Sequence, residues 1–224
     1  MNDIRFRPKY ISFDCYGTLI YYDIATVTRE LIGDRLSAEQ FDRFIVDFRA
    51  YRYDQILGEF YAYQQVLADA FGRTCRKWGL EPNPDAGEKL AAAVRGWGPH
   101  TDVPEPLKKM GENFPLVILS NADNSFLDVS VPKLGADFHA VYTAEQAGFY
   151  KPRLQAFEYM FDTLGAKPEE FLHVSSHMLY DLIPGEWLGM KNKVMLDRGY
   201  DPLNPAYNYE VASDLNVVNK LLGL

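Results

Sequence analysis

A continuous apolar run at residues 115–119, ending at Ser120, restricts the fold of this chain more than any other segment. Such a run is typical of a parallel strand buried on both faces, because a strand with one solvated face alternates polar and apolar residues. Further strands are predicted at residues 10–13, 141–142, 171–174 and, as the last strand, 193–196, with helices over 104–110 and 154–164 between them. This alternation predicts an α/β fold, a Rossmann-like core with a doubly wound parallel sheet.

A helical block at residues 24–95 interrupts the alternation. One helix is predicted to begin at Ser37, followed by apolar side chains at helical spacing, and a second to run over residues 59–78. Because this block separates the first strand from the others, we interpret it as an inserted helical domain. The expected boundaries are 22–99 for the inserted helical domain, and 1–21 with 100–224 for the Rossmann-like core.

The composition argues against several functional classes. The 224-residue chain is 47% hydrophobic and carries a net charge of -8, so it has apolar surface enough to fold and lacks the basic clusters that nucleic-acid binding needs. Two cysteines, Cys15 and Cys75, cannot form a disulfide framework or a cysteine-rich zinc site. No apolar stretch is long enough to span a membrane, and the N-terminus lacks a signal-peptide run. We expect a soluble cytoplasmic protein without membrane or nucleic-acid partners.

Polar side chains follow the predicted strands, where ligands bind in open α/β sheets. They are Asp14, Ser120 with Asn121, Lys151, and Ser176 with Asp181. Each has an ordinary explanation alone: Asp14 could cap a turn, Ser120 could begin a helix, and Lys151 could lie on the surface. Together they indicate covalent catalysis by a carboxylate, which forms an ester that water hydrolyses. Such a carboxylate must stay ionised, and a nearby cation such as Lys151 favours that form.

Four motifs carry a family resemblance. FDCYGT at residues 13–18 resembles motif I of the haloacid dehalogenase superfamily, LSN at 119–121 motif II, YKP at 150–152 motif III, and SSHMLYD at 175–181 motif IV. The resemblance extends over residues 10–196, with the cap inserted where the family places it.

Two positions distinguish this chain from the magnesium-dependent phosphatases that make up most of the superfamily. Their second motif I aspartate protonates the leaving alcohol, whereas Tyr16 stands here, and a phenol is a poor general acid at neutral pH. Their motif IV has an acidic pair for magnesium, whereas Ser175 and Ser176 leave Asp181 alone. A halide leaving group needs neither proton nor metal. The chain therefore resembles the L-2-haloacid dehalogenase branch, which implies no metal and no cofactor.

The resemblance implies a role for each matched residue. Asp14 is the nucleophile that displaces halide, and Lys151 keeps it ionised. Thr18 lies beside the nucleophile, Ser176 hydrogen-bonds the lysine or substrate, and Asp181 orients the lysine and the hydrolytic water. Substrate-lining residues are implied at Tyr16, Ser120 and Asn121.

Several positions depart from the best-known dehalogenases. Those enzymes have a tyrosine six positions after the lysine, where this chain has Phe157, which we still expect to line the substrate. They have an asparagine in motif IV, where this chain has Met178. Motif II continues to Asp123, an acid near a pocket meant for an anion. The cap arginine that receives the halide and carboxylate has no direct counterpart. Arg49 and Arg52, three apart on one helix face, could serve, or could lie on the surface.

Histidines and aromatic residues supply the remaining candidates. His177 could contact substrate or water, or could be part of the scaffold. His139 and His173 are expected to be structural, and a zinc pair of His173 with His177 is disfavoured because His173 lies in a predicted strand. Aromatic residues of the cap could form a dry pocket, with Tyr63 as the best candidate, or could pack helices and a dimer face.

The sequence thus predicts a hydrolase acting on carbon–halide bonds. The favoured reaction converts short L-2-haloalkanoic acids to 2-hydroxy acids through an Asp14 ester, with a small carboxylic acid as ligand and a possible homodimer. One alternative displaces a different leaving group from carbon, such as ring opening of a small cyclic amino acid, whose ammonium Asp123 would favour. A phosphatase is disfavoured by Tyr16. A non-catalytic binding protein is disfavoured because it has no chemical need for Asp14 and Lys151 together.

Overall fold

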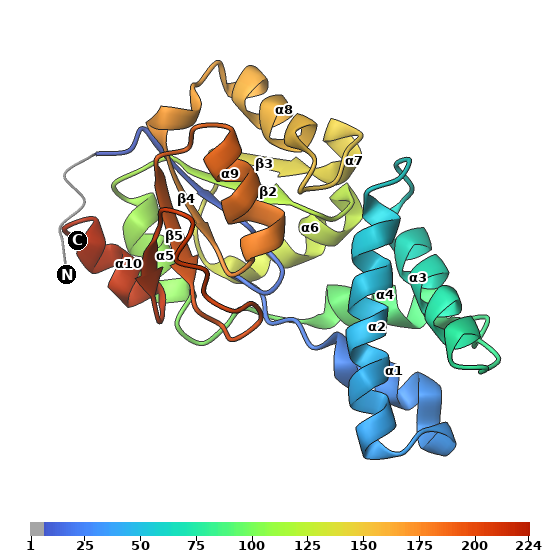
Figure 1. Ribbon diagram of the computed structural model, residues 1–224. Helices are drawn as coiled ribbons and strands as arrows, with labels where there is room; N and C mark the ends of the chain where they lie inside the picture. The colour runs from blue at the N-terminus through green and yellow to red at the C-terminus, as the bar shows by residue number, and fades with distance from the viewer. Residues whose placement is uncertain (1–6) are drawn as a thin grey trace. The chain divides into compact units, whose positions relative to one another are not determined.

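The computed structural model describes residues 7–224, which divide into two compact units. One unit is Tyr22–Trp97, and the other combines the chain up to Tyr21 with Gly98–Leu224 (Figure 1). Residues 1–6 of the predicted core lie outside the described part of the chain. Each unit is described below by itself.

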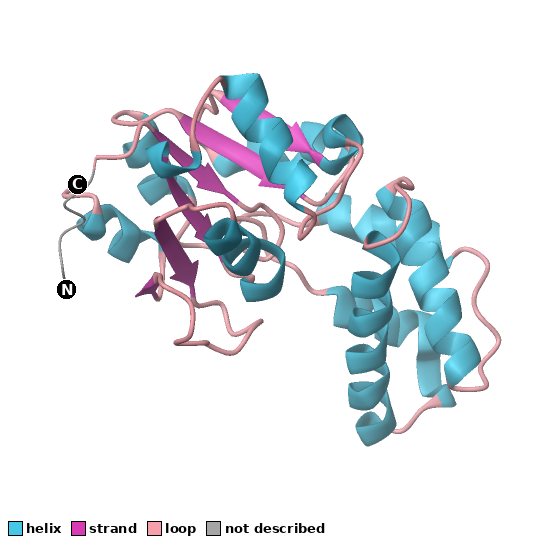
Figure 2. Ribbon diagram, turned by 45° about the horizontal axis from the view of Figure 1, so that its top comes forward, coloured by secondary structure: helices cyan, strands magenta, loops and turns pink. Residues whose placement is uncertain are grey.

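A six-stranded parallel sheet forms the centre of the core unit (Figure 2). The strand order is β3-β2-β1-β4-β5-β6. The strands are β1 (Tyr10–Phe13), β2 (Leu116–Ser120), β3 (Ala140–Thr143), β4 (Phe171–Ser175), β5 (Asn192–Leu196) and β6 (Glu210–Ala212). The central strands β1, β2 and β4 are buried along their whole length, as expected where helices cover both faces. The predicted α/β fold with a parallel sheet is confirmed.

The edge strand β6 was not predicted, so the expectation that residues 193–196 form the last strand is wrong. β6 has only 3 residues, and Glu210 and Val211 are exposed. No apolar pattern therefore marks it in the sequence. It forms because the chain returns beside β5, to which it pairs in parallel.

Six helices accompany the sheet in the described part of the core. They are α5 (Pro104–Gly111), α6 (Asn124–Ser130), α7 (Ala144–Ala147), α8 (Leu154–Leu164), α9 (Ile183–Trp187) and α10 (Leu215–Leu221). α8 buries Phe157, Met160 and Phe161 against the sheet residue Phe171. α10 packs against α5. These contacts hold the sheet rigid, so the polar residues at its carboxyl ends are held in place as well.

The cap unit contains four α-helices, α1 (Ile24–Ile32), α2 (Ala38–Ile56), α3 (Tyr63–Lys77) and α4 (Ala86–Gly96). Ser37 caps α2 as predicted, and Gln40 completes a capping box. α3 begins at Tyr63 and not at residue 59, because residues 59–62 are largely exposed and add no apolar face to pack. Among residues 7–224, no helix has the length and apolar character needed to cross a membrane.

Candidate active site

Asp14 lies at the carboxyl end of the sheet, directly after β1, and is almost fully buried. Its backbone N–H donates to the Val174 carbonyl of β4 at 3.2 Å. The chain then turns at Gly17, where φ is 93°. A Cβ at this position would lie 2.6 Å from Nε2 of His177. The turn and the close approach of His177 therefore both require glycine in motif I.

The Lys151 ammonium binds both site carboxylates. Nζ donates to Oδ1 of Asp14 at 2.9 Å, to Oδ1 of Asp181 at 2.6 Å, and to the Leu119 carbonyl at 2.8 Å. Lys151 is 1% exposed. All three ammonium hydrogens thus have acceptors, which is the condition under which a buried charge is tolerated.

The electrostatics of this cluster keep Lys151 and Asp181 charged. Burial acts to lower the pKa of Lys151, but Asp14 and Asp181 outweigh burial and raise it above its ordinary value. Burial likewise acts to raise the pKa of Asp181, but Lys151 and then His173 hold it well below its usual range. Asp181 is therefore an ionised hydrogen-bond acceptor at neutral pH.

Thr18 holds the other oxygen of the nucleophile. Its hydroxyl donates to Oδ2 of Asp14 at 2.7 Å and accepts from the backbone N–H of Ser176 at 2.9 Å. The Ser176 hydroxyl lies 3.0 Å from the Thr18 hydroxyl. Ser176 therefore supports Thr18, whereas the prediction was a hydrogen bond to the lysine or to the substrate. Ser175 is the motif IV serine that touches the cluster, since its hydroxyl donates to Oδ2 of Asp181 at 3.0 Å.

The two motif II residues have different surroundings. The Asn121 amide donates to the Lys151 carbonyl at 2.8 Å and its oxygen accepts from the Lys151 N–H at 2.7 Å. Asn121 therefore clamps the backbone that carries the lysine. The Ser120 hydroxyl is buried and has no hydrogen-bond partner among the described residues. A buried hydroxyl of this kind is a ready donor for a bound anion.

Tyr16, at the position of the phosphatase acid, has its hydroxyl engaged elsewhere. The hydroxyl donates to the Phe126 carbonyl at 3.2 Å and lies 2.8 Å from the Ser130 hydroxyl, both on α6. The side chain is half-buried. These bonds fix the Tyr16 ring beside the turn of motif I.

His177 lies close to the nucleophile. Its Nε2 is 4.0 Å from Oδ2 of Asp14 and donates to the Tyr16 carbonyl at 3.2 Å. The rings of Tyr180 and Tyr200 lie 5.5 and 5.7 Å from the imidazole, centre to centre. The structure therefore brings His177 into the candidate site.

A π-helical turn at Met178–Leu182 carries Asp181. A π turn accommodates one residue more than an α turn, which suits the five-residue separation of Ser176 and Asp181. The backbone N–H of Met178 donates to Oδ2 of Asp201 at 2.8 Å, and the Met178 side chain packs with Leu182. Met178 is therefore a packing residue at the position where an asparagine was expected.

Phe157 lies in the core, whereas it was expected to line the substrate. It is fully buried in the apolar cluster between α8 and the sheet, so it packs beneath the polar cluster. Its ring centre lies 5.8 Å from that of His173.

Asp123, the departure in motif II, is buried at the start of α6. Burial and then the charge of Asp123 raise the pKa of Tyr150 far above its ordinary value.

His173 is the residue that the sequence analysis missed. It was expected in an apolar, structural setting, yet Nε2 lies 3.1 Å from Oδ1 of Asp181 and Nδ1 lies 2.8 Å from the Ser12 hydroxyl. The available signal was strand pairing: Ser12 and His173 occupy the same register position in β1 and β4. Two polar residues facing each other inside apolar strands indicate a buried polar network.

The cap unit contains a separate cluster around Arg52. Its guanidinium donates to the Tyr22 hydroxyl and lies 5.1 Å from the ring centre of Phe48. The Tyr22 hydroxyl lies 3.2 Å from that of Tyr63. Arg52 is half-buried and Arg49 is exposed. The structure thus associates two predicted residues, Arg52 and Tyr63, within the cap.

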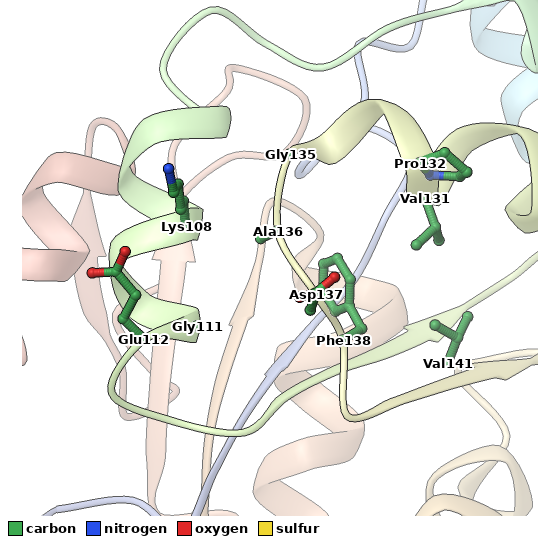
Figure 3. Close-up of a pocket in the computed structure, with 10 residues that line it drawn as sticks. All are labelled: Lys108, Gly111, Glu112, Val131, Pro132, Gly135, Ala136, Asp137, Phe138 and Val141. Atoms are coloured by element: carbon green, nitrogen blue, oxygen red, sulfur yellow. The ribbon is translucent and has the colours of Figure 1, made fainter.

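A hollow of about 560 Å³ lies elsewhere on the core (Figure 3). Its wall includes Lys108 of α5, Glu112 directly after that helix, and Asp137 and Phe138 of the segment before β3. None of the predicted site residues lines it. It plays no part in the chemistry considered below.

The donor set at the candidate site does not fit magnesium. Within residues 7–224, no three His, Cys, Asp or Glu side chains are grouped as metal ligands. Asp14 and Asp181 both bind the Lys151 ammonium, and the adjoining motif IV groups are the Ser175 and Ser176 hydroxyls. Magnesium prefers several oxygen ligands that include carboxylates free to coordinate it.

Three features together indicate a hydrolase: the Rossmann-like core, the inserted helical unit and the buried carboxylate–lysine cluster. The sequence pattern of the family described as haloacid dehalogenase-like hydrolases matches residues 8–189, and the chain belongs to this family. The predicted superfamily is thereby confirmed.

Relatives of this chain include named dehalogenases. The (S)-2-haloacid dehalogenase of Pseudomonas sp. (strain YL) is 26% identical over 209 residues, which cover 87% of this chain and 88% of that protein. The L-2-haloacid dehalogenase of Xanthobacter autotrophicus, solved with chloropropionic acid covalently bound, has a TM-score of 0.75 at 21% identity and covers 97% of this chain and 99% of that one. A magnesium-bound putative HAD-hydrolase from Bacillus subtilis has a TM-score of 0.81 at 16% identity, with 98% and 100% coverage. The fold is therefore shared by different members, and the reaction has to be argued from the residues.

Proposed function

We propose that the protein hydrolyses short L-2-haloalkanoic acids to 2-hydroxy acids through an ester on Asp14. The observation that carries this proposal is the buried cluster in which the Lys151 ammonium binds both Asp14 and Asp181. In the first step a carboxylate oxygen of Asp14 attacks the α-carbon. The carbon–halogen bond breaks, the halide leaves with the bonding electrons, and the configuration at carbon inverts.

In the second step water adds to Cγ of Asp14. The bond between Cγ and the ester oxygen, which came from Asp14, then breaks. The 2-hydroxy acid leaves with that oxygen and one proton of the water, and the other proton is released as Asp14, now carrying the water oxygen, regains its charge. Lys151 donates to Oδ1 and Thr18 donates to Oδ2. Whichever oxygen forms the ester, the other retains a donor that stabilises the oxyanion formed when water adds.

The groups around Asp14 favour displacement at carbon over phosphate transfer. The Tyr16 hydroxyl, which would have to act as the acid for an alcohol leaving group, is bonded to α6. A halide leaves without a proton, so this loss does not affect dehalogenation. Burial and then the charge of Asp14 raise the pKa of the Cys15 thiol far above its ordinary value. Cys15 is therefore not a rival nucleophile.

We assign the substrate carboxylate to the Ser120 hydroxyl. The names of the relatives support an anionic 2-haloacid, and the unpartnered Ser120 hydroxyl can donate to it. From the family resemblance, we further propose a cytoplasmic homodimer that takes a small carboxylic acid and needs no metal or cofactor.

Arg52 is the better candidate for the cap arginine. Its guanidinium is held by Tyr22 and Phe48, so little conformational entropy is lost when it binds a carboxylate. We expect Arg52→Lys to reduce kcat/KM for L-2-chloropropionate by about 10- to 100-fold, the effect of losing a charged hydrogen bond. The matched variant Arg49→Lys should retain the wild-type value. The reverse order of effects would assign the role to Arg49.

The test of the proposed function is halide release from L- and D-2-chloropropionate with EDTA present. We expect release from the L-enantiomer only, with the D-2-hydroxy acid as product because the first step inverts carbon. Release that stops in EDTA would contradict the metal-free mechanism. If neither enantiomer releases halide, the substrate class is wrong, and ring opening of a small cyclic amino acid becomes the next reaction to measure.

A further inference from the structure

His173 lies inside the core and connects β1 with the candidate site. It is fully buried in β4, next to Ser12 of β1. Its Nε2 lies 3.1 Å from Oδ1 of Asp181, and its Nδ1 lies 2.8 Å from the Ser12 hydroxyl. Both ring nitrogens therefore have partners, and each partner comes from a different element.

The chemistry of the partners assigns the ring proton. Asp181 is ionised beside Lys151 and can only accept, so Nε2 must carry the hydrogen and donate. The Ser12 hydroxyl can then donate to the lone pair of Nδ1. Asp181 thus selects the tautomer of His173, and the Ser12 hydroxyl satisfies the other ring nitrogen.

Asp181 is consequently held by three donors from three directions. His173 and Lys151 donate to Oδ1, and the Ser175 hydroxyl donates to Oδ2. Lys151 in turn binds Oδ1 of Asp14. The bonds form a continuous chain from Ser12 through His173, Asp181 and Lys151 to Asp14. Asp181 is thus one of the three acceptors that hold the Lys151 ammonium, beside Asp14 and the Leu119 carbonyl.

We propose that His173 is a positioning residue, which orients Asp181 so that Lys151 is held against Asp14. His173 touches neither substrate nor reacting atoms and acts only through Asp181. The inference rests on the proposed function for its kinetic part. Its structural part, the coupling of His173 to Asp181, does not depend on any substrate.

The kinetic test compares His173→Gln with His173→Phe. Glutamine can place an N–H near the position of Nε2, whereas phenylalanine fits beside Phe157 but donates nothing to Asp181. We expect His173→Phe to lower kcat for L-2-chloropropionate by about 10- to 100-fold with little change in KM, as is typical when an outer partner of a site is lost. His173→Gln should recover most of that loss. His139→Phe, the same change at an exposed histidine of the same unit whose ring centre lies 5.7 Å from that of Tyr10, should leave kcat unchanged.

A residue that serves only packing would give the opposite order, because phenylalanine suits an apolar core and glutamine does not. That order would overturn the proposal.

A double-mutant cycle in urea unfolding tests the coupling without any substrate. His173→Phe should reduce the free energy of unfolding in the wild-type background and have a much smaller effect in the Asp181→Asn background. Equal effects in both backgrounds would contradict a role through Asp181. If wild type releases no halide but the cycle shows coupling, the proposed substrate is wrong and the positioning role stands.

Discussion

Replacing Asp14 with asparagine is expected to reduce halide release from L-2-chloropropionate by about 10⁴-fold or more, the scale seen when a covalent nucleophile is removed. An amide oxygen is a poor nucleophile, and the side chain keeps its size, so the fold should persist. Steady-state halide release measures the loss. A single turnover of wild type in ¹⁸O-water then locates the oxygen. Because water attacks Cγ, the label should enter the Asp14 carboxylate, and the first 2-hydroxy acid formed should be unlabelled.

The control for this substitution is Asp128→Asn. Asp128 is exposed on α6, in the same unit as Asp14, so the variant makes the same chemical change away from the site. It should release halide at the wild-type rate. Label found in the product of the first turnover would show that water attacks the substrate directly, and Asp14 would then be a base and not a nucleophile.

Replacing Lys151 with methionine is expected to abolish halide release. It should also destabilise the fold by about 3–5 kcal/mol, the cost of removing one partner of a buried ion pair and leaving the other charge unpaired. Methionine keeps most of the side-chain volume but leaves Asp14 and Asp181 buried without their shared cation. Urea unfolding at pH 7 gives the stability. The Lys151→Met/Asp181→Asn double variant should recover much of the stability and none of the activity, because one uncompensated charge has been removed.

The pH dependence of unfolding gives an independent check on Lys151. In wild type the Asp181 pKa is below its unfolded value, so its contribution to stability is present above the unfolded pKa and is lost as pH falls toward the folded one. In Lys151→Met the cation is gone, burial raises the pKa of Asp181, and stability should increase as pH falls from 7 to 5. As a matched control, Lys77→Met removes an exposed ion pair with Asp47 in the cap and should cost far less. A small loss in Lys151→Met with an unchanged pH slope would contradict the charged cluster described here.

Much of the fold follows from local patterns. β2, which contains all of the predicted apolar run except Pro115, is buried at every position, and the helix predicted over residues 154–164 is α8. Such elements are predictable because their own residues supply the buried faces. β6 and the late start of α3 were missed for the same reason: their conformation depends on neighbours, and their own residues show no periodicity.

The candidate site was predictable to the level of motifs but not of contacts. Asp14, Lys151 and Asp181 lie together because parallel strands end at one edge of the sheet. The family resemblance placed Ser176 in the site, and only the structure shows that the Ser175 hydroxyl is the one that reaches Asp181. A shift of one residue along a strand moves a side chain to the opposite face, so adjacent serines cannot be distinguished without the register.

The sequence by itself determined the α/β class, the inserted helical block and the set of charged residues at the strand ends, because these depend on periodicity and on residue type. The tertiary structure decided their partners. Phe157 is a core residue and His173 is a hydrogen-bond partner of Asp181, because β1, β4 and α8 pack against one another. Hydrogen bonds between residues more than 100 positions apart form only after apolar burial has set strand register, and that burial is a property of the whole sheet.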